Sequence, residues 1–222
     1  MSKLDKWLSD HFGPKMMAVI TGISMVLGVA LAFGLFFYLP TFLVDTVDKY
    51  LFKDALAGLH PLFEGVMRMV IFVAYVWIVS KIPDIKRVFM YHGAEHKSIF
   101  CYAHGLELTV ENLRKQKRFH PRAGTSFIFV VLIISIFLSS ALVVIFPGID
   151  DVRIVWMGIK LLIMPLTVGV SYEFIKYAGK HDNIITKIFS APGLWMQRIT
   201  TKEPTDDMIE VAIASIKAVV PD

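Results

Sequence analysis

Residues 125–146 have the sequence TSFIFVVLIISIFLSSALVVIF, which contains no charged side chain. A helix needs about 20 apolar residues to cross the hydrocarbon core of a bilayer, so this stretch predicts a transmembrane helix. Three further segments have a similar length and character, at residues 16–39, 62–82 and 154–177. We therefore expect an all-α, polytopic membrane protein with four transmembrane helices.

The composition of the chain supports this expectation. The 222 residues are 55% hydrophobic and 19% charged, with a mean hydropathy of +0.61. A soluble domain of this length could not cover so much apolar surface with so few charges. The first segment is too long for a cleaved signal peptide, and no small-residue cleavage site follows it. The chain is expected to form a single membrane domain, and the one cysteine, Cys101, excludes an intramolecular disulfide framework.

Lysine and arginine residues lie mostly on one side of the predicted spans. The connection at residues 83–124 contains eight of them, whereas the connection between the last two spans contains only Arg153. The positive-inside rule therefore places residues 83–124, both termini and the C-terminal segment 178–222 on the cytoplasmic side. The sequence pI of about 9.1 reflects this asymmetry, which also favours contact with anionic membrane lipid.

The parts outside the spans show helical patterns. The long connection is expected to hold one helix over residues 84–102 and a second one that begins at Thr109, a typical N-cap. Residues 43–51 predict a short helix on the outer face. Asp206 and Asp207 open a C-terminal amphipathic helix that ends near Val220. Its apolar stripe comprises Met208, Val211, Ala212, Ser215 and Val219.

The segment whose residue types suit metal binding or catalysis is HGAEHK, at residues 92–97. On a helix, His92, Glu95 and His96 share one face, because positions i, i+3 and i+4 are neighbours. Two neutral imidazoles one turn apart can bind zinc or another divalent metal, and Glu95 could then act as general base on a bound water. His120, fixed by the turn at Pro121, is the leading third ligand. Other candidates are Glu107, Glu111 and Glu173.

Two other interpretations of this segment stay open. In the first, His92 and His96 donate hydrogen bonds to backbone carbonyls or to Glu173, and Glu95 pairs with Arg122 or Lys97, so that the segment forms a buried polar network. In the second, the segment is a solvated helix face. These readings predict a structural role in place of a metal site.

Charged residues inside the predicted spans form a second candidate site. Glu64 and Arg68 lie one turn apart in the second span, and Lys160 lies at a similar depth in the fourth. Charges in a bilayer need partners, so we expect these three side chains to form a polar cluster. An ion pair that fixes helix register is favoured over a transport role, because nothing else in the spans resembles a relay.

Several motifs together resemble one family. They are DIKRVF at 84–89, YHGAEHK at 91–97, LTVEN at 108–112, HPRAGTS at 120–126 and APGLWMQRITTKEP at 191–204. From about Pro61 onward the chain resembles the YqhQ-like family of bacterial membrane proteins of unknown function. The resemblance implies a multi-pass protein of the cytoplasmic membrane and brings no established activity. This chain has Ala103 and Ala123 where the family pattern has Glu and Cys, and it lacks the family's Gly-Gly-Gln-Ala-type opening.

Two functions compete at this point. The favoured one is a noncatalytic membrane component that docks a cytoplasmic protein or lipid, because Ala103 and Ala123 remove two residues of a metal-binding or catalytic type. The alternative is a zinc-dependent hydrolase at the membrane surface, with His92, His96 and His120 as ligands and Glu95 as base. Whether the protein is an enzyme is left open. A homo-oligomer is compatible with both, and nucleic acid is disfavoured because the basic run at 114–118 has no interleaved aromatic residues.

Overall fold

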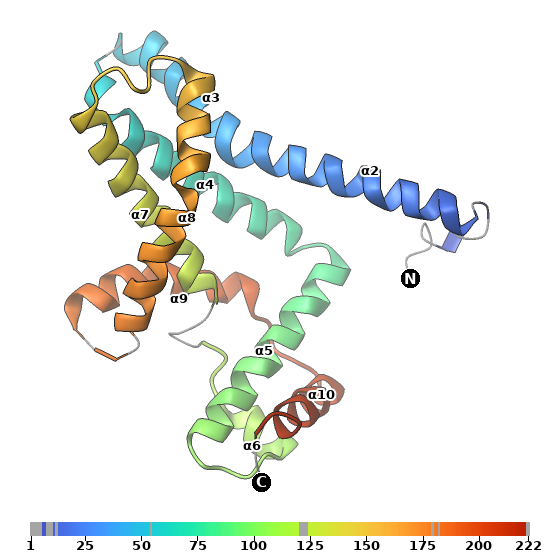
Figure 1. Cartoon of the computed structure of the whole chain (residues 1–222). Helices are drawn as coiled ribbons and strands as arrows, with labels where there is room; N and C mark the ends of the chain where they lie inside the picture. The colour runs from blue at the N-terminus through green and yellow to red at the C-terminus, as the bar shows by residue number, and fades with distance from the viewer. Residues whose placement is uncertain are drawn as a thin grey trace. The chain divides into compact units, whose positions relative to one another are not determined.

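The computed structural model describes residues 6–7, 11, 13–53, 55–119, 124–178, 180–181 and 183–220, which are almost entirely helical (Figure 1). They divide into two compact units, Met1–Leu56 and Ala57–Asp222. Four helices are long and apolar enough to cross a membrane: Lys15–Phe52, His60–Val79, Ser126–Ile145 and Arg153–Ala178. The expected all-α fold with four such helices is confirmed.

The first unit is one continuous helical rod. Helix α2 (Pro14–Phe33) runs through a π-helical turn, η1 (Gly34–Tyr38), into α3 (Leu39–Val47) and a second π-helical turn, η2 (Asp48–Phe52). The expected separate helix at 43–51 is therefore part of the longer rod. Pro40, which has no backbone N–H to donate, lies just after the π-helical turn η1, and the rod continues through it. Lys53, in the left-handed conformation, ends the rod.

The second unit begins with a short 3-10 turn, η3 (Ala57–Leu59), and contains seven α-helices in its described part. Helices α4 (His60–Val79), α7 (Gly124–Ile145) and α8 (Arg153–Ala178) coincide with the last three predicted spans. Helix α7 packs against α4, α8 and α9 (Ile184–Thr200). The α7 and α9 backbones approach closely, since a Cβ on Gly193 would lie 2.3 Å from the Cα of Ser126.

The remaining helices form a group around α5 (Pro83–Ala103). Pro83 occupies the first turn of α5 and separates it from α4. Helix α6 (Val110–Lys115) begins as expected at Thr109, whose hydroxyl accepts a hydrogen bond from the Asn112 amide, and α10 spans Asp206–Lys217. Helices α5, α6 and α10 lie together (Figure 1). They bury a common core, which comprises Ala94, Cys101, Leu113, Met208 and Ile209.

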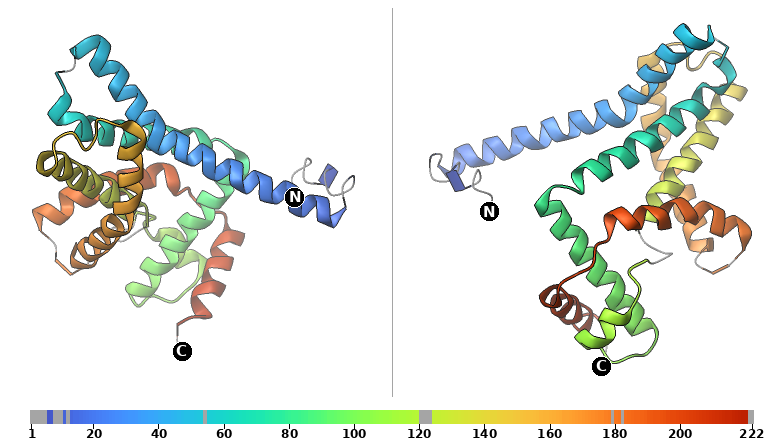
Figure 2. Two further views of the ribbon diagram at one scale, coloured as in Figure 1. Left: turned by 45° about the horizontal axis from the view of Figure 1, so that its top comes forward. Right: turned by 180° about the vertical axis from the view of Figure 1, so that it is seen from behind.

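Helix α9 was not anticipated from the sequence, which predicted a cytoplasmic segment at 178–222. Apart from the fully buried Met196, its buried residues are small or polar, namely Thr186, Ser190, Gly193, Gln197 and Thr200. Its exposed residues include the large apolar side chains of Ile184, Ile188 and Trp195 beside the cations Lys187 and Arg198, so much of the usual amphipathic arrangement of a soluble protein is inverted. Figure 2 shows α9 running beside α7 and reaching the beginning of α5.

Candidate functional site

The segment after α9 crosses α5 at Gly93. The backbone N–H of Lys202 donates a hydrogen bond to the carbonyl oxygen of Phe89 at 2.8 Å. A Cβ on residue 93 would lie 2.1 Å from the Lys202 carbonyl oxygen. Only glycine allows this approach, so the glycine of the HGAEHK segment is explained by the packing of one backbone on another.

Both histidines of the segment hold backbone carbonyls around this crossing. His92 Nδ1 donates to the carbonyl oxygen of Thr200 at 2.9 Å, and His96 Nδ1 donates to that of Arg118 at 2.5 Å. The two rings meet edge to face with centroids 4.4 Å apart. Since a carbonyl oxygen only accepts, each imidazole carries a proton on Nδ1. The two side chains therefore connect α5 to two segments that lie far from it in the sequence.

Lys97, a buried cation, completes the junction through an ion pair with the more exposed Glu203. Its Nζ lies 2.6 Å from Glu203 Oε1 and donates to the Arg114 carbonyl oxygen at 2.9 Å, while Arg118 binds the other Glu203 oxygen at 2.8 Å. The Lys97 residue is only 3% exposed, so the Glu203 carboxylate compensates a charge that is largely removed from water. Burial alone would raise the pKa of Glu203, but the hydrogen bonds and charges of Lys97 and Arg118 outweigh it and lower that pKa.

The divalent-metal site expected from the sequence finds no support here. Among the residues that the structure describes, no three His, Cys, Asp or Glu side chains converge in a way that could hold a metal ion. His120 and Arg122 lie outside the described residues. Glu173 lies on α8, exposed and 3.6 Å from Lys176, and Glu111 pairs with Lys115. The described contacts of His92 and His96 match the alternative of a buried polar network.

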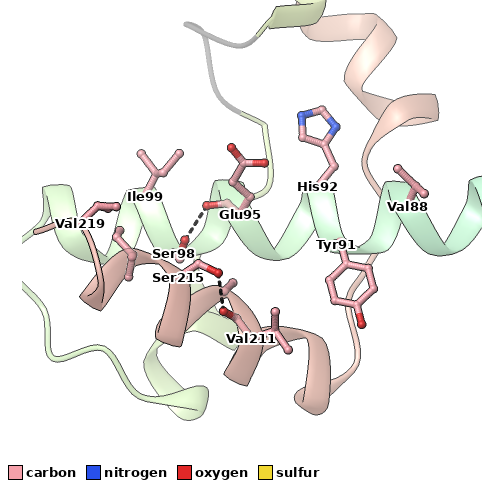
Figure 3. Close-up of a pocket in the computed structure, with 11 residues that line it drawn as sticks. Val88, Tyr91, His92, Glu95, Ser98, Ile99, Val211, Ser215 and Val219 are labelled. Atoms are coloured by element: carbon pink, nitrogen blue, oxygen red, sulfur yellow. Dashed lines mark hydrogen bonds between the residues drawn. The ribbon is translucent and has the colours of Figure 1, made fainter.

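Glu95 is the residue of HGAEHK that faces outward. Its side chain is exposed and makes no hydrogen bond or ion pair with the described part of the chain. It lies beside His92 along a groove of about 660 Å³ between α5 and α10 (Figure 3). The groove is mostly apolar, and its lining includes Val88, Ile99, Val211, Ala212, Ile216 and Val219. Four residues of the predicted α10 stripe, Val211, Ala212, Ser215 and Val219, thus lie on this groove, while Met208 is buried in the core.

The structure also brings Glu64, Arg68 and Lys160 together between α4 and α8. Lys160 Nζ forms a close ion pair with Glu64 Oε1, and Arg68 lies 3.4 Å from the same oxygen. Trp156 donates its indole N–H to Glu64 Oε2 at 3.3 Å, and Lys160 lies over its ring. The Trp156 partner could not be recognised from sequence, because indole side chains at the ends of spans are common and carry no pairing signal.

Comparison with known proteins gives the same family over almost the entire chain. The family model described as Protein of unknown function (DUF1385) matches residues 4–222. The chain belongs to this family. Uncharacterized protein YqhQ of Bacillus subtilis (strain 168), which resembles it, is 35% identical over 207 residues, or 88% of this chain. The aligned region covers 61% of the length of that relative, and no solved structure matches.

Family membership extends the resemblance beyond the motif-bearing region, which began near Pro61, to the first helical unit. Ala103, where the resemblance led us to expect Glu, lies exposed at the C-terminal end of α5. It is two helical turns from His96, or about 10 Å along the axis. Ala123 lies outside the described residues.

Proposed function

We propose that this protein is a noncatalytic component of the bacterial cytoplasmic membrane whose α5–α10 groove docks an amphipathic helix of a cytoplasmic protein. The proposal rests on one observation, which is that four residues of HGAEHK are used in packing while Glu95 is left exposed. His92, Gly93, His96 and Lys97 secure α5 to residues 200–203 and Arg118. Glu95 remains exposed beside an open apolar groove, which is the arrangement of a docking surface.

The membrane location is supported by the four long apolar helices and by their exposed side chains. In the most apolar 18-residue stretch of Lys15–Phe52, no residue is buried within the structure. In the corresponding stretches of the other three helices, at most 28% of the residues are buried. Such surfaces are favourable in lipid and unfavourable in water. The cytoplasmic orientation of α5, α6 and α10 rests on the excess of lysine and arginine at residues 83–124.

The groove has the form that suits a helix. Two neighbouring helices supply its apolar side chains, as in other proteins that bind an amphipathic helix through residues spaced by three or four. Glu95 is the acidic residue of the lining. We therefore expect the partner helix to present an apolar stripe with a lysine or arginine opposite Glu95.

A photo-crosslinking amino acid placed at Ile99 tests the docking role in intact cells, with the exposed position Glu210 as control. We expect a protein adduct at position 99 and none at position 210. Mass spectrometry should locate the crosslink in an amphipathic helix with a basic residue. The substitutions Val211→Asp and Glu95→Lys should each abolish the adduct, because they introduce a charge into the apolar wall or reverse the one at its edge. Adducts with lipid alone, or an adduct that both substitutions leave unchanged, would refute this role.

Reporter fusions test the membrane orientation separately. Fusions at Lys115 should report the cytoplasm and fusions at Asp150 the outer side, because basic residues concentrate around the first position. An external reading at Lys115 would place the groove on the wrong side of the membrane for a cytoplasmic partner.

A further inference from the structure

A second groove lies between α4 and α9. It measures about 420 Å³ and is lined entirely by apolar residues, which are Met69, Val70, Val73, Ala74, Trp77, Trp195 and Ile199. Two tryptophans, each about half exposed, contribute one side chain from each helix. Tryptophan side chains of this kind concentrate where the hydrocarbon core of a membrane meets the headgroups.

The exposed face of α9 shows which medium surrounds this groove. Ile184 is 70% exposed and Ile188 61%, whereas Gln197 on the opposite face is fully buried. The helix also exposes Lys187 and Arg198, whose long side chains can extend to the headgroups. A helix that turns its polar side chains toward the protein and its apolar side chains outward is stable when lipid surrounds it. The groove beside Trp195 therefore faces acyl chains.

Cations lie just beyond the groove on both of its helices. Lys81 follows Trp77 by one turn, with its Nζ 4.8 Å from the centre of the Trp77 ring, and Lys202 follows Ile199 by three residues. The pKa of Lys202 is lowered first by burial and then by repulsion from three nearby cations, Lys81, Arg118 and Lys86. Arg118 is paired with Glu203, so Lys81, Lys86 and Lys202 supply an excess of positive charge.

We infer that the α4–α9 groove binds an anionic phospholipid, with one acyl chain along the apolar wall and the phosphate near Lys81, Lys86 and Lys202. The positive charge of the three lysines selects the headgroup. A net anionic lipid relieves the repulsion among the lysines, whereas in a zwitterionic lipid the positive ammonium group offsets the attraction between the phosphate and the lysines. The apolar wall selects a lipid over a soluble phosphate. The inference rests on the membrane location in the proposed function and not on the α5–α10 groove.

Native mass spectrometry of the full chain in detergent tests this site with equal amounts of phosphatidylglycerol and phosphatidylethanolamine. We expect preferential retention of phosphatidylglycerol. The triple substitution Lys81→Gln, Lys86→Gln and Lys202→Gln should lower its affinity by about fivefold for each lysine removed. A matched control with Lys176→Gln, Lys180→Gln and Lys187→Gln removes the same charge from α8, from the other end of α9 and from the connection between them, and it should keep the preference.

Two further experiments separate the contribution of the apolar groove from that of the lysines. Val73→Trp, which fills the groove, should lower retention of both lipids, and an excess of glycerol 3-phosphate should not displace the bound lipid. Equal retention of the two lipids by the unmodified chain would overturn the inference, as would an equal loss in both triple variants or displacement by glycerol 3-phosphate. Failure of the membrane location itself would be recognised independently, by release of the protein from membranes with alkaline carbonate.

Discussion

His92 Nδ1 and the carbonyl oxygen of Thr200 are joined by a hydrogen bond of 2.9 Å across 108 positions of sequence. The bond connects the first residue of the HGAEHK segment to the last residue of α9. A motif that resembles half of a metal site is thereby used to hold two distant parts of the chain together. The same bond supports a direct test of that role.

Replacing His92 should separate its structural role from metal binding. His92→Ala leaves the Thr200 carbonyl without a partner and should lower the free energy of unfolding by about 1–3 kcal/mol. His92→Asn should retain part of this stability, because the asparagine Nδ2 donor can replace Nδ1–H. Thermal unfolding and elemental analysis should be measured on each variant. A stoichiometric metal that is present in the unmodified chain and lost in both variants would contradict the hydrogen-bond role.

Gly93→Ala should disrupt the crossing of residues 200–203 over α5. The new Cβ would lie 2.1 Å from the Lys202 carbonyl oxygen, and that backbone cannot move away without weakening its bond to Phe89. Overpacking of this kind costs about 1–3 kcal/mol. The matched control is Gly158→Ala in α8, where no atom lies within 4 Å and alanine should stabilise the helix slightly. Equal melting temperatures for the two variants would show that residues 200–203 accommodate the new methyl group without loss of stability.

Lys160→Met should destabilise the helix bundle, because it removes the closer of the two cations that contact the buried Glu64 carboxylate, Arg68 lying at 3.4 Å. Breaking a buried ion pair costs about 3–5 kcal/mol. The triple substitution Glu64→Gln, Arg68→Met and Lys160→Met should recover much of this loss, since it leaves neither a buried carboxylate nor a buried cation of the cluster without its partner. Unfolding of both variants in detergent measures the difference. The exposed Lys176→Met variant serves as the control, and a triple variant as unstable as the single one would refute this ion-pair account.

Acid should weaken the α5 junction through Glu203. Its pKa is lower in the folded chain than in the unfolded chain, so its stabilising effect is complete above the ordinary glutamate pKa and disappears as the pH falls below the lowered value. The stability difference between the unmodified chain and Glu203→Gln should therefore shrink on acidification from pH 7 across that window. Glu111→Gln, which removes an exposed pair with Lys115, should show a smaller difference. A difference for Glu203→Gln that is independent of pH would exclude an ionic role.

The sequence by itself determined the helical content and the four long apolar helices. These features depend on local properties, namely the length of an apolar run, the positions of proline and the capping residue at Thr109. The locations of α5, α6 and α10 followed from the same signals. In the first unit the break expected between two helices did not occur, because a π-helical turn before Pro40 allows the helix to continue.

Only the tertiary structure decided what HGAEHK does. On a helix, His92, Glu95 and His96 share a face whether they bind an ion or donate to carbonyls, so local spacing does not distinguish these roles. The distinction depends on the segment at 200–203, which approaches α5 from more than a hundred residues away. The inverted face of α9 likewise became meaningful only through its packing on α7, because a polar stripe in a sequence does not state whether protein or water will cover it.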